Sequence, residues 1–148
     1  MTLNGSYRIS APRQAVWAAL MDPEVLKKCL PGCEKLDPVG PDAYRAHMKV
    51  GIAAIKGSYQ GSVSIHEKVA PEKFRMVVEG KGAPGFLRGE GSFELVEEGS
   101  ETLLRYQGTA QVGGMIAGVG QRLVQGAARM VVRKFFEALS SHLASATP

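Results

Sequence analysis

The chain has 148 residues, of which 45% are hydrophobic and 22% charged, and its formal net charge is +4. This length and composition are those of one globular domain, and they exclude an intrinsically disordered or collagen-like chain. The mild positive charge is compatible with anionic surfaces as partners, but it does not indicate a nucleic-acid-binding protein.

The N-terminal part of the chain predicts one strand followed by two short helices. Apolar and polar residues alternate over residues 2–9, which is the period of a half-buried strand. Pro12 suits the first position of a helix that runs to Leu20. Asp22-Pro23 starts a second helix, which ends before Pro31-Gly32.

Residues 45–112 predict an antiparallel meander. Five runs of alternating apolar and polar residues are separated by turn or breaker residues at Gly57, Pro71, 82–85 and 98–100. The charged residues fall on the polar side of each run. We therefore expect a sheet with one face toward the core and one face toward water.

Residues 115–144 change to a helical period, with an apolar arc about twice the ~100° of an ordinary surface helix. Thirty residues of helix span about 45 Å, so this helix has to be held across a curved sheet. The predicted fold is α+β: a curved antiparallel sheet wrapped around a long C-terminal helix. We expect residues 1–145 to form a single domain and residues 146–148 a C-terminal tail.

Glycine is unusually frequent, with 18 residues spread through the predicted strands and the long helix. Two explanations remain open. Glycines allow a sheet to bend around a helix, and glycines that replace large core residues leave empty volume, which a bound ligand would stabilise. The glycines that share a face with large apolar residues are Gly61, Gly80, Gly89, Gly91 and Gly108.

If there is a cavity, its walls follow from the two periodic patterns. Sheet residues on the apolar face should line one side, and apolar residues of the long helix the other. Two tyrosines would bring hydroxyls that need hydrogen-bond partners there. The residues predicted to bind ligand are Met48, Val50, Ile52, Tyr59, Val63, Met76, Val78, Phe93, Tyr106, Ala110, Met115, Val119, Leu123 and Met130.

Four stretches of the chain match a known family. They are Ala11-Pro12 with Val16-Trp17 and Asp22-Pro23; Leu30-Pro31-Gly32-Cys33-Glu34; Val50-Gly51-Ile52 leading to Lys56-Gly57; and Gly113 to Gly118 with Gly120.

With these stretches, nearly the whole chain resembles the helix-grip superfamily of START-like and Bet v 1-like (SRPBCC) lipid-binding domains. More narrowly, it resembles the CoxG-like family, which takes its name from carbon monoxide dehydrogenase. The resemblance implies a cavity between sheet and C-terminal helix for an apolar ligand. It also implies an accessory role beside a molybdenum hydroxylase of the carbon monoxide dehydrogenase type, in maturation, membrane recruitment or quinone delivery.

We expect binding without catalysis, with a long-chain quinone or a lipid as ligand, and neither cofactor nor metal. His47 and His66 fall on the polar strand face and His142 lies near the chain end, so none resembles a tuned general base. Cys29 and Cys33 are expected to be partly buried apolar residues rather than a metal or redox pair. The alternatives are an aromatase/cyclase-like enzyme and a protein-interaction module without ligand.

Arg122, Arg129 and Arg133 are spaced by seven and four residues, so they share one helix face. That face is either simply solvated or docks on an acidic partner or an anionic membrane. Two cysteines cannot form a disulfide framework, and no secretory signal or membrane-spanning stretch is apparent. We expect a cytoplasmic protein, with peripheral contact at the inner face of the membrane as an open alternative.

Overall fold

The computed structural model describes residues 1–145, so the predicted tail at 146–148 lies outside the described residues. Its strands are β1 (Thr2–Ile9), β2 (Cys33–Gly40), β3 (Ala43–Val50), β4 (Gly57–Val69), β5 (Lys73–Gly82), β6 (Gly85–Glu98) and β7 (Glu101–Gly113). Its helices are α1 (Arg13–Leu20), α2 (Pro23–Cys29), the 3-10 helix η1 (Met115–Val119) and α3 (Gln121–Ser145).

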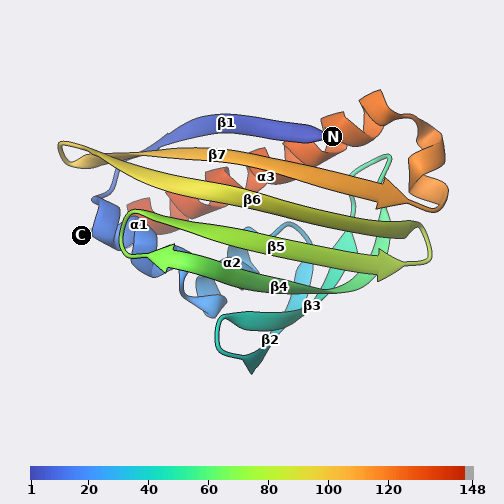
Figure 1. Ribbon diagram of the computed structural model, residues 1–148, viewed down its shortest axis with the longest axis horizontal. Coiled ribbons are helices and arrows are strands. Elements are labelled where there is room, and N and C mark those ends of the chain that lie inside the picture. Colours follow the sequence, from blue (N-terminus) through green and yellow to red (C-terminus); the bar gives the residue numbers. More distant parts are fainter. Residues whose placement is uncertain (146–148) are drawn as a thin grey trace.

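The seven strands form one antiparallel sheet in the order β1-β7-β6-β5-β4-β3-β2. The chain thus runs as a meander from β2 to β7, and β1 pairs with β7 at the far edge. Helix α3 lies across one face of the curved sheet, while α1 and α2 connect the two sheet edges (Figure 1). This arrangement confirms the predicted α+β fold, with two short helices after the first strand and a C-terminal helix held by the sheet. No described helix is long and apolar enough to span a membrane.

The core is densest under the C-terminal half of α3. Phe136 and Leu139 of that half are almost fully buried, as are Phe74 and Leu104 of the sheet. The ring of Phe136 lies 5.6 Å from that of Tyr106, centroid to centroid. Large side chains from both layers therefore fill this end of the interface between sheet and helix, and their burial anchors α3 to the sheet.

Strand β2 was missed by the sequence prediction. Its burial does not alternate, because Leu36 alone is buried. Pro38 lies opposite Tyr44, and the register with β3 shifts between Cys33 and Lys35 and again between Pro38 and Gly40. Strand β2 lies at the sheet edge and pairs only with β3. Its proline and its bulges interrupt the regular alternation of side chains, so the sequence shows no period of two residues there.

The predicted first run of the meander is too long. Its alternation continues to Ala54, but β3 ends at Val50 and residues 51–56 form an irregular connection to β4. Ala54 has a φ of 79° there. The strand therefore ends at Val50, although apolar and polar residues continue to alternate in the sequence as far as Ala54.

The predicted single helix over 115–144 is also wrong in its first turns. Gly120 adopts φ 103° and ψ 141°, a conformation that L side chains rarely adopt, and it separates η1 from α3. The helical phase is therefore not continuous across Gly120, which changes which side chains face the sheet.

Thr102 is the one polar side chain that is buried among the described residues, with 0% exposure. Its hydroxyl donates a 2.8 Å hydrogen bond to the carbonyl oxygen of Ala11. This contact joins the start of β7 to the segment between β1 and α1.

Replacing Thr102 by valine should lower the free energy of unfolding by about 1–3 kcal/mol, because the buried carbonyl of Ala11 loses its donor. Urea denaturation measures this change. Thr109→Val, at an exposed position of the same strand, is the control and should change stability by less than about 0.5 kcal/mol. Equal stability of both variants would show that the Thr102 bond contributes nothing.

Candidate functional site: an apolar cavity beneath the N-terminal half of α3

A cavity of about 330 Å³ lies between the sheet and the N-terminal half of α3. Its wall is built from β3 to β7 on one side and from η1 and α3 on the other. Pockets that enclose small molecules have volumes of roughly 300–1,000 Å³, so this cavity lies at the lower limit of that range. It can enclose a ring system or a short stretch of hydrocarbon chain, but not a whole long-chain lipid.

The cavity exists because side-chain volume falls along the interface. The C-terminal half of α3 contributes phenylalanines and leucines, whereas the wall near its N-terminus consists of Val124, Ala128, Val131 and Val132. The facing strands contribute several glycines at positions where large residues would otherwise meet the helix. The glycines in the cavity wall are Gly61, Gly80, Gly89, Gly91 and Gly108.

Two different causes explain these glycines: close approach of a neighbouring strand, and volume that is left unfilled. A Cβ at Gly61 would collide with the carbonyl oxygen of Glu79, because the backbone of β5 approaches too closely for any side chain. A Cβ at Gly80 would lie 3.7 Å from the nearest atom, a side-chain carbon of Leu87, which is ordinary contact. Gly61 is thus required by the close packing of the strands, whereas Gly80 leaves volume unfilled.

The structure places nine of the fourteen predicted ligand-binding residues in the cavity wall, which leaves their contact with a ligand as a prediction. These nine come from β3 to β7, where the alternation identified the inward face correctly. They are Met48, Val50, Tyr59, Val63, Met76, Val78, Phe93, Tyr106 and Ala110.

The other five predicted residues are not in the cavity wall. Ile52 lies in the irregular connection after β3. Met115 and Val119 lie on η1, where the break at Gly120 changes the helical phase, and they are 73% and 42% exposed. Leu123 and Met130 are on α3 but outside the arc that faces the sheet, with exposures of 60% and 37%.

The helix side of the wall was therefore assigned to the wrong residues. Smaller members of the same apolar arc face the cavity, and they were passed over because the prediction favoured methionine and leucine. Other lining residues come from loops and chain ends, where no periodic pattern of apolar residues could predict that they face the cavity. The lining residues that the prediction missed include Met1, Leu3, Leu30, Pro31, Ile55, Leu87, Val112, Ile116, Val124, Ala128, Val131 and Val132.

Two tyrosine hydroxyls belong to the cavity wall. The hydroxyl of Tyr59 donates a 2.6 Å hydrogen bond to the carbonyl oxygen of Ile55, which ties the connection 51–56 to β4. The ring of Tyr106 is stacked against those of Tyr7 and Phe136, which also lie against each other. Burial raises the pKa of both Tyr59 and Tyr106, and Arg129 partly opposes the rise at Tyr106. Both hydroxyls are therefore neutral hydrogen-bonding groups at physiological pH.

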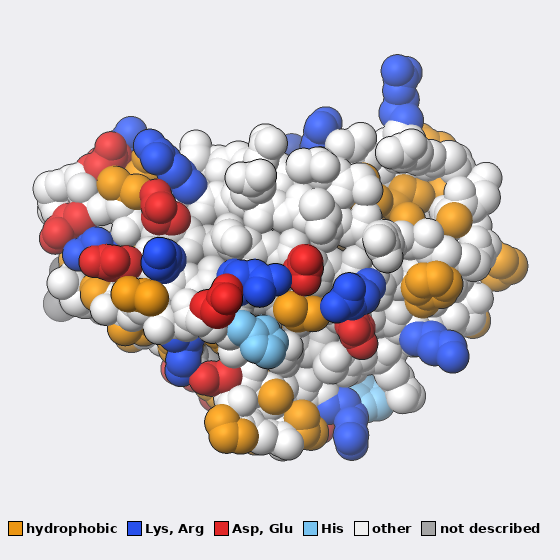
Figure 2. Space-filling model, in the orientation of Figure 1, with side chains coloured by type: hydrophobic (Ala, Val, Ile, Leu, Met, Phe, Trp, Pro, Cys, Tyr) orange, Lys and Arg blue, Asp and Glu red, His pale blue; other side chains and the backbone are white. Residues whose placement is uncertain are grey.

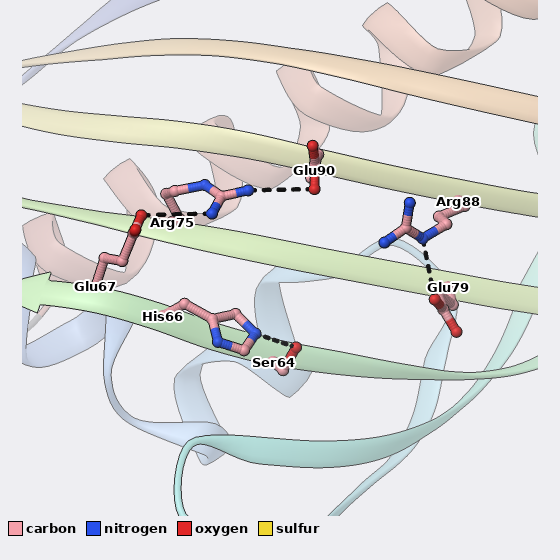
Figure 3. A network of polar contacts seen from close by, with 7 residues as sticks. All are labelled: Ser64, His66, Glu67, Arg75, Glu79, Arg88 and Glu90. Atoms are coloured by element: carbon pink, nitrogen blue, oxygen red, sulfur yellow. Dashed lines mark hydrogen bonds and ion pairs between the residues drawn. The ribbon is translucent and has the colours of Figure 1, made fainter.

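Charged side chains of the same strands lie on the opposite face of the sheet. The guanidinium of Arg75 reaches Glu90 at 3.2 Å and Glu67 at 3.4 Å, and Arg88 reaches Glu79 at 3.2 Å (Figure 3). Glu79 and Glu90 border the cavity, yet their carboxylates pair with arginines on the outer face. The interior is consequently apolar, and no ion pair crosses it among the described residues.

A broader depression on the outer face of the sheet is lined by polar and charged side chains such as Ser6, Arg75, Ser92 and Gln107. Its chemistry does not suit an apolar ligand. The described residues contain no group of three or more histidine, cysteine or acidic side chains that could hold a metal ion.

Neither cysteine is arranged for redox chemistry. Cys29 is buried in the core, and Cys33 donates a weak hydrogen bond to the carbonyl oxygen of Lys35. Burial raises the pKa of both thiols, with Lys28 and Lys27 opposing the rise. A raised pKa reduces the thiolate fraction and hence the reactivity.

The three arginines of the predicted stripe are exposed on α3. Arg133 lies 3.8 Å from Glu137, one turn further along the helix. Arg122 belongs to the first turn of α3, close to η1, while Arg129 lies two turns further on. The stripe therefore extends from the cavity end of the molecule toward its packed end.

Solved structures with the same fold come from several bacteria. The chain is 36% identical to a conserved protein of Geobacillus kaustophilus, with a TM-score of 0.95 over 98% of this chain and 96% of that one. A START superfamily protein of Mycobacterium smegmatis has a TM-score of 0.78 at 15% identity over 99% of both chains. A Thermus thermophilus protein has a TM-score of 0.76 at 20% identity over the full length of both. The latter two likenesses show the fold alone.

No curated protein matches the chain. The family model that matches is that of CoxG, described as a subunit of carbon monoxide dehydrogenase. It covers residues 5–144, which is nearly the whole of the sheet and helix just described. The chain therefore belongs to the CoxG family, and its fold is START-like.

Proposed function

We propose that this protein binds an apolar ligand in the cavity beneath α3 without transforming it. The observation that supports this most directly is the cavity wall, where inward-facing residues are apolar while the charges of the same strands pair on the other face. Apolar surface facing empty volume is costly, and a hydrophobic occupant offsets that cost. A long-chain quinone or a lipid fits these requirements, with its ring or first carbons enclosed and the rest of its chain outside.

The setting that we propose is an accessory role beside a molybdenum hydroxylase of the carbon monoxide dehydrogenase type. Its support is the family description, which names carbon monoxide dehydrogenase. Maturation, membrane recruitment and quinone delivery are the three forms that such a role can take. Quinone delivery makes most use of an apolar cavity.

The competing enzyme hypothesis is an aromatase/cyclase-like activity on a hydrophobic substrate. It requires titratable groups that reach the substrate. In the described cavity wall, the inward-facing groups of this kind are the hydroxyls of Tyr59 and Tyr106, and that of Tyr59 is engaged with Ile55. Two tyrosines with raised pKa values are hydrogen-bond donors rather than bases, which favours binding over catalysis.

Native mass spectrometry of the protein purified from its own host tests the carrier hypothesis directly. We expect a stoichiometric adduct that solvent extraction identifies as a quinone or a lipid. A clean unliganded mass, together with no thermal stabilisation by added quinones or lipids, would contradict the proposal.

Filling the cavity should abolish binding and leave the fold intact. Ala110 lines the cavity on β7, whereas Leu123 is exposed. Ala110→Trp should therefore weaken the binding of a short-chain quinone by at least about tenfold, and Leu123→Trp should not, although both introduce the same indole. Titration by isothermal calorimetry gives the affinities, and circular dichroism verifies folding.

Ala128→Phe, which fills the same volume from α3, is a second variant in case Ala110→Trp does not fold. Unchanged affinity in a folded cavity-filling variant would show that the ligand lies elsewhere.

Charge reversal separates the carrier from an interaction module. In a carrier, Arg133→Glu should leave quinone affinity within about twofold, because this side chain is exposed and does not belong to the cavity wall. The same titration measures it. The interaction-module hypothesis would be favoured instead if the charge-reversed variant lost a protein partner and neither it nor the parent chain bound quinone.

A further inference from the structure

Strand β1 has one backbone edge that no other strand covers. It is the outermost strand of the sheet, next to β7 (Figure 1). At its start, the amino group of Met1 donates a 2.8 Å hydrogen bond to the carbonyl oxygen of Ala110, and the amide of Ala110 donates a 2.9 Å hydrogen bond to the carbonyl oxygen of Met1. Bonded and non-bonded residues alternate in an antiparallel pair. The odd-numbered residues of β1 therefore bond to β7, and the even-numbered residues direct their amides and carbonyls away from the sheet.

The uncovered backbone groups lie in the middle and at the end of the strand. The side chain of Gln125, on α3, donates a 3.3 Å hydrogen bond to the carbonyl oxygen of Thr2, which agrees with an outward direction of the even-numbered groups. For Asn4, Ser6 and Arg8, residues 1–145 supply no backbone partner on this side. All three residues are exposed. The free edge is thus a stretch of three alternating residues, centred on Ser6.

Strand β1 lacks the features that usually protect an edge strand, which are prolines, bulges and outward charges. The opposite edge strand, β2, has Pro38 and two register shifts. In contrast, β1 pairs with β7 without a shift from Thr2 to Ile9. Its one charged residue, Arg8, is paired with Glu98 of β6, two strands further into the sheet. In Figure 2 the surface over the middle of β1, along the upper edge of the view, is largely white, without charged or hydrophobic side chains.

We propose that this edge pairs with β1 of a second copy of the chain, in antiparallel orientation, about a two-fold axis at Ser6. A two-fold interface uses the same surface on both copies, and a free stretch centred on one residue meets that condition. In this register Ser6 lies opposite Ser6 of the partner subunit, and Asn4 lies opposite Arg8 of the partner subunit. Each of these pairs exchanges backbone hydrogen bonds. A register centred on Gly5 would instead need the carbonyl of Thr2, which Gln125 already occupies.

The side chains on the inner face allow the two strands to approach. Gly5 lies opposite Tyr7 of the partner subunit at a position without backbone hydrogen bonds, where Cα atoms are about 4.5 Å apart. A Cβ at Gly5 would lie 2.7 Å from the hydroxyl oxygen of Tyr106, so this position has no room for a side chain. The ring of Tyr7 packs on Phe136 of its own chain, at 4.7 Å between centroids. A glycine therefore faces each tyrosine across the interface, and no two bulky side chains meet there.

The size of this contact determines how strong the association is. One pair of edge strands buries less than the roughly 1,200–2,000 Å² of stable complexes. We therefore expect a reversible dimer whose population rises with protein concentration. Asn4, Ser6 and Arg8 do not belong to the cavity wall, so the inference is independent of the proposed ligand.

Sedimentation equilibrium of the full chain, from micromolar to millimolar concentration, tests the inference. The average mass should rise toward that of a dimer. Ser6→Pro should weaken self-association by at least about tenfold, because it removes the amide hydrogen at the axis from both copies. Proline is tolerated on an edge strand where the amide faces solvent, and circular dichroism verifies that this variant is folded.

A pair of charge variants tests the register itself and does not depend on a proline. Ser6→Lys and Ser6→Asp each place like charges opposite one another at the axis, so each should weaken self-association by about fivefold at low salt. An equimolar mixture of the two variants should associate at least as strongly as the parent chain, because opposite charges then face each other. Ser62→Lys, the same exchange at an exposed position on β4, should associate like the parent chain.

Hydrogen exchange locates the interface. The amides of Asn4, Ser6 and Arg8 should become protected as protein concentration rises, whereas those of β2 should not. A chain that stays monomeric at millimolar concentration overturns the inference, and β1 would then be free or take a strand of a different protein. A dimer that persists unchanged in Ser6→Pro and in both charge variants also overturns it, because the interface would lie elsewhere. The same holds if mixing the charge variants restores no association.

Discussion

The gradient of side-chain volume along the interface between α3 and the sheet is the constraint on which the rest of the structure depends. At the packed end, Phe136 and Leu139 meet Phe74 and Leu104, and these four side chains are nearly fully buried. Toward the other end the helix presents valines and alanines to a sheet rich in glycine. A helix anchored so firmly at one end can span a void at the other, because the packed half fixes its position. The cavity therefore results from the distribution of large and small side chains along the interface between α3 and the sheet.

The second organising feature is the separation of apolar and charged groups by the two faces of the strands. Successive side chains alternate across a sheet, so a strand such as β5 can present Met76 and Val78 to the cavity and Arg75 and Glu79 to the other face. The outer charges are paired with one another across neighbouring strands. Exposed pairs of this kind contribute little to stability. Their effect here is to keep the charged groups on the outer face of the sheet. The few polar side-chain groups that face the interior are hydroxyls.

Together these features make the two ends of the molecule different. The packed end contains the buried contact between Thr102 and Ala11, and its glutamates Glu97 and Glu98 pair with Arg13 and Arg8. The hollow end carries exposed apolar side chains, and two segments outside the sheet, the connection 51–56 and η1, contribute residues to the cavity wall. The largest buried side chains lie at one end, and the cavity proposed to bind a ligand lies at the other. Segments with few sheet hydrogen bonds are those that open most readily in a folded protein, which suits the end through which a ligand would pass.

Most of the fold and the sheet side of the cavity follow from the sequence alone. Alternation of period two depends only on local backbone geometry, and it identified the inward face of β4 to β7 as well as residues such as Met76 and Tyr106. The helical period likewise identified α3. The four stretches that resemble CoxG proteins indicated the family that the matched model shows.

The tertiary structure decided what depends on contacts between distant segments. It placed Val124 and Ala128, rather than Leu123 and Met130, in the cavity wall, because the sheet covers only part of the apolar arc of α3. It also broke the predicted helix at Gly120. An apolar pattern states which residues avoid water on average, but not which remain uncovered. Which apolar side chains stay exposed is determined by the packing of the other elements, and at the hollow end the sheet does not cover all of the apolar arc of α3.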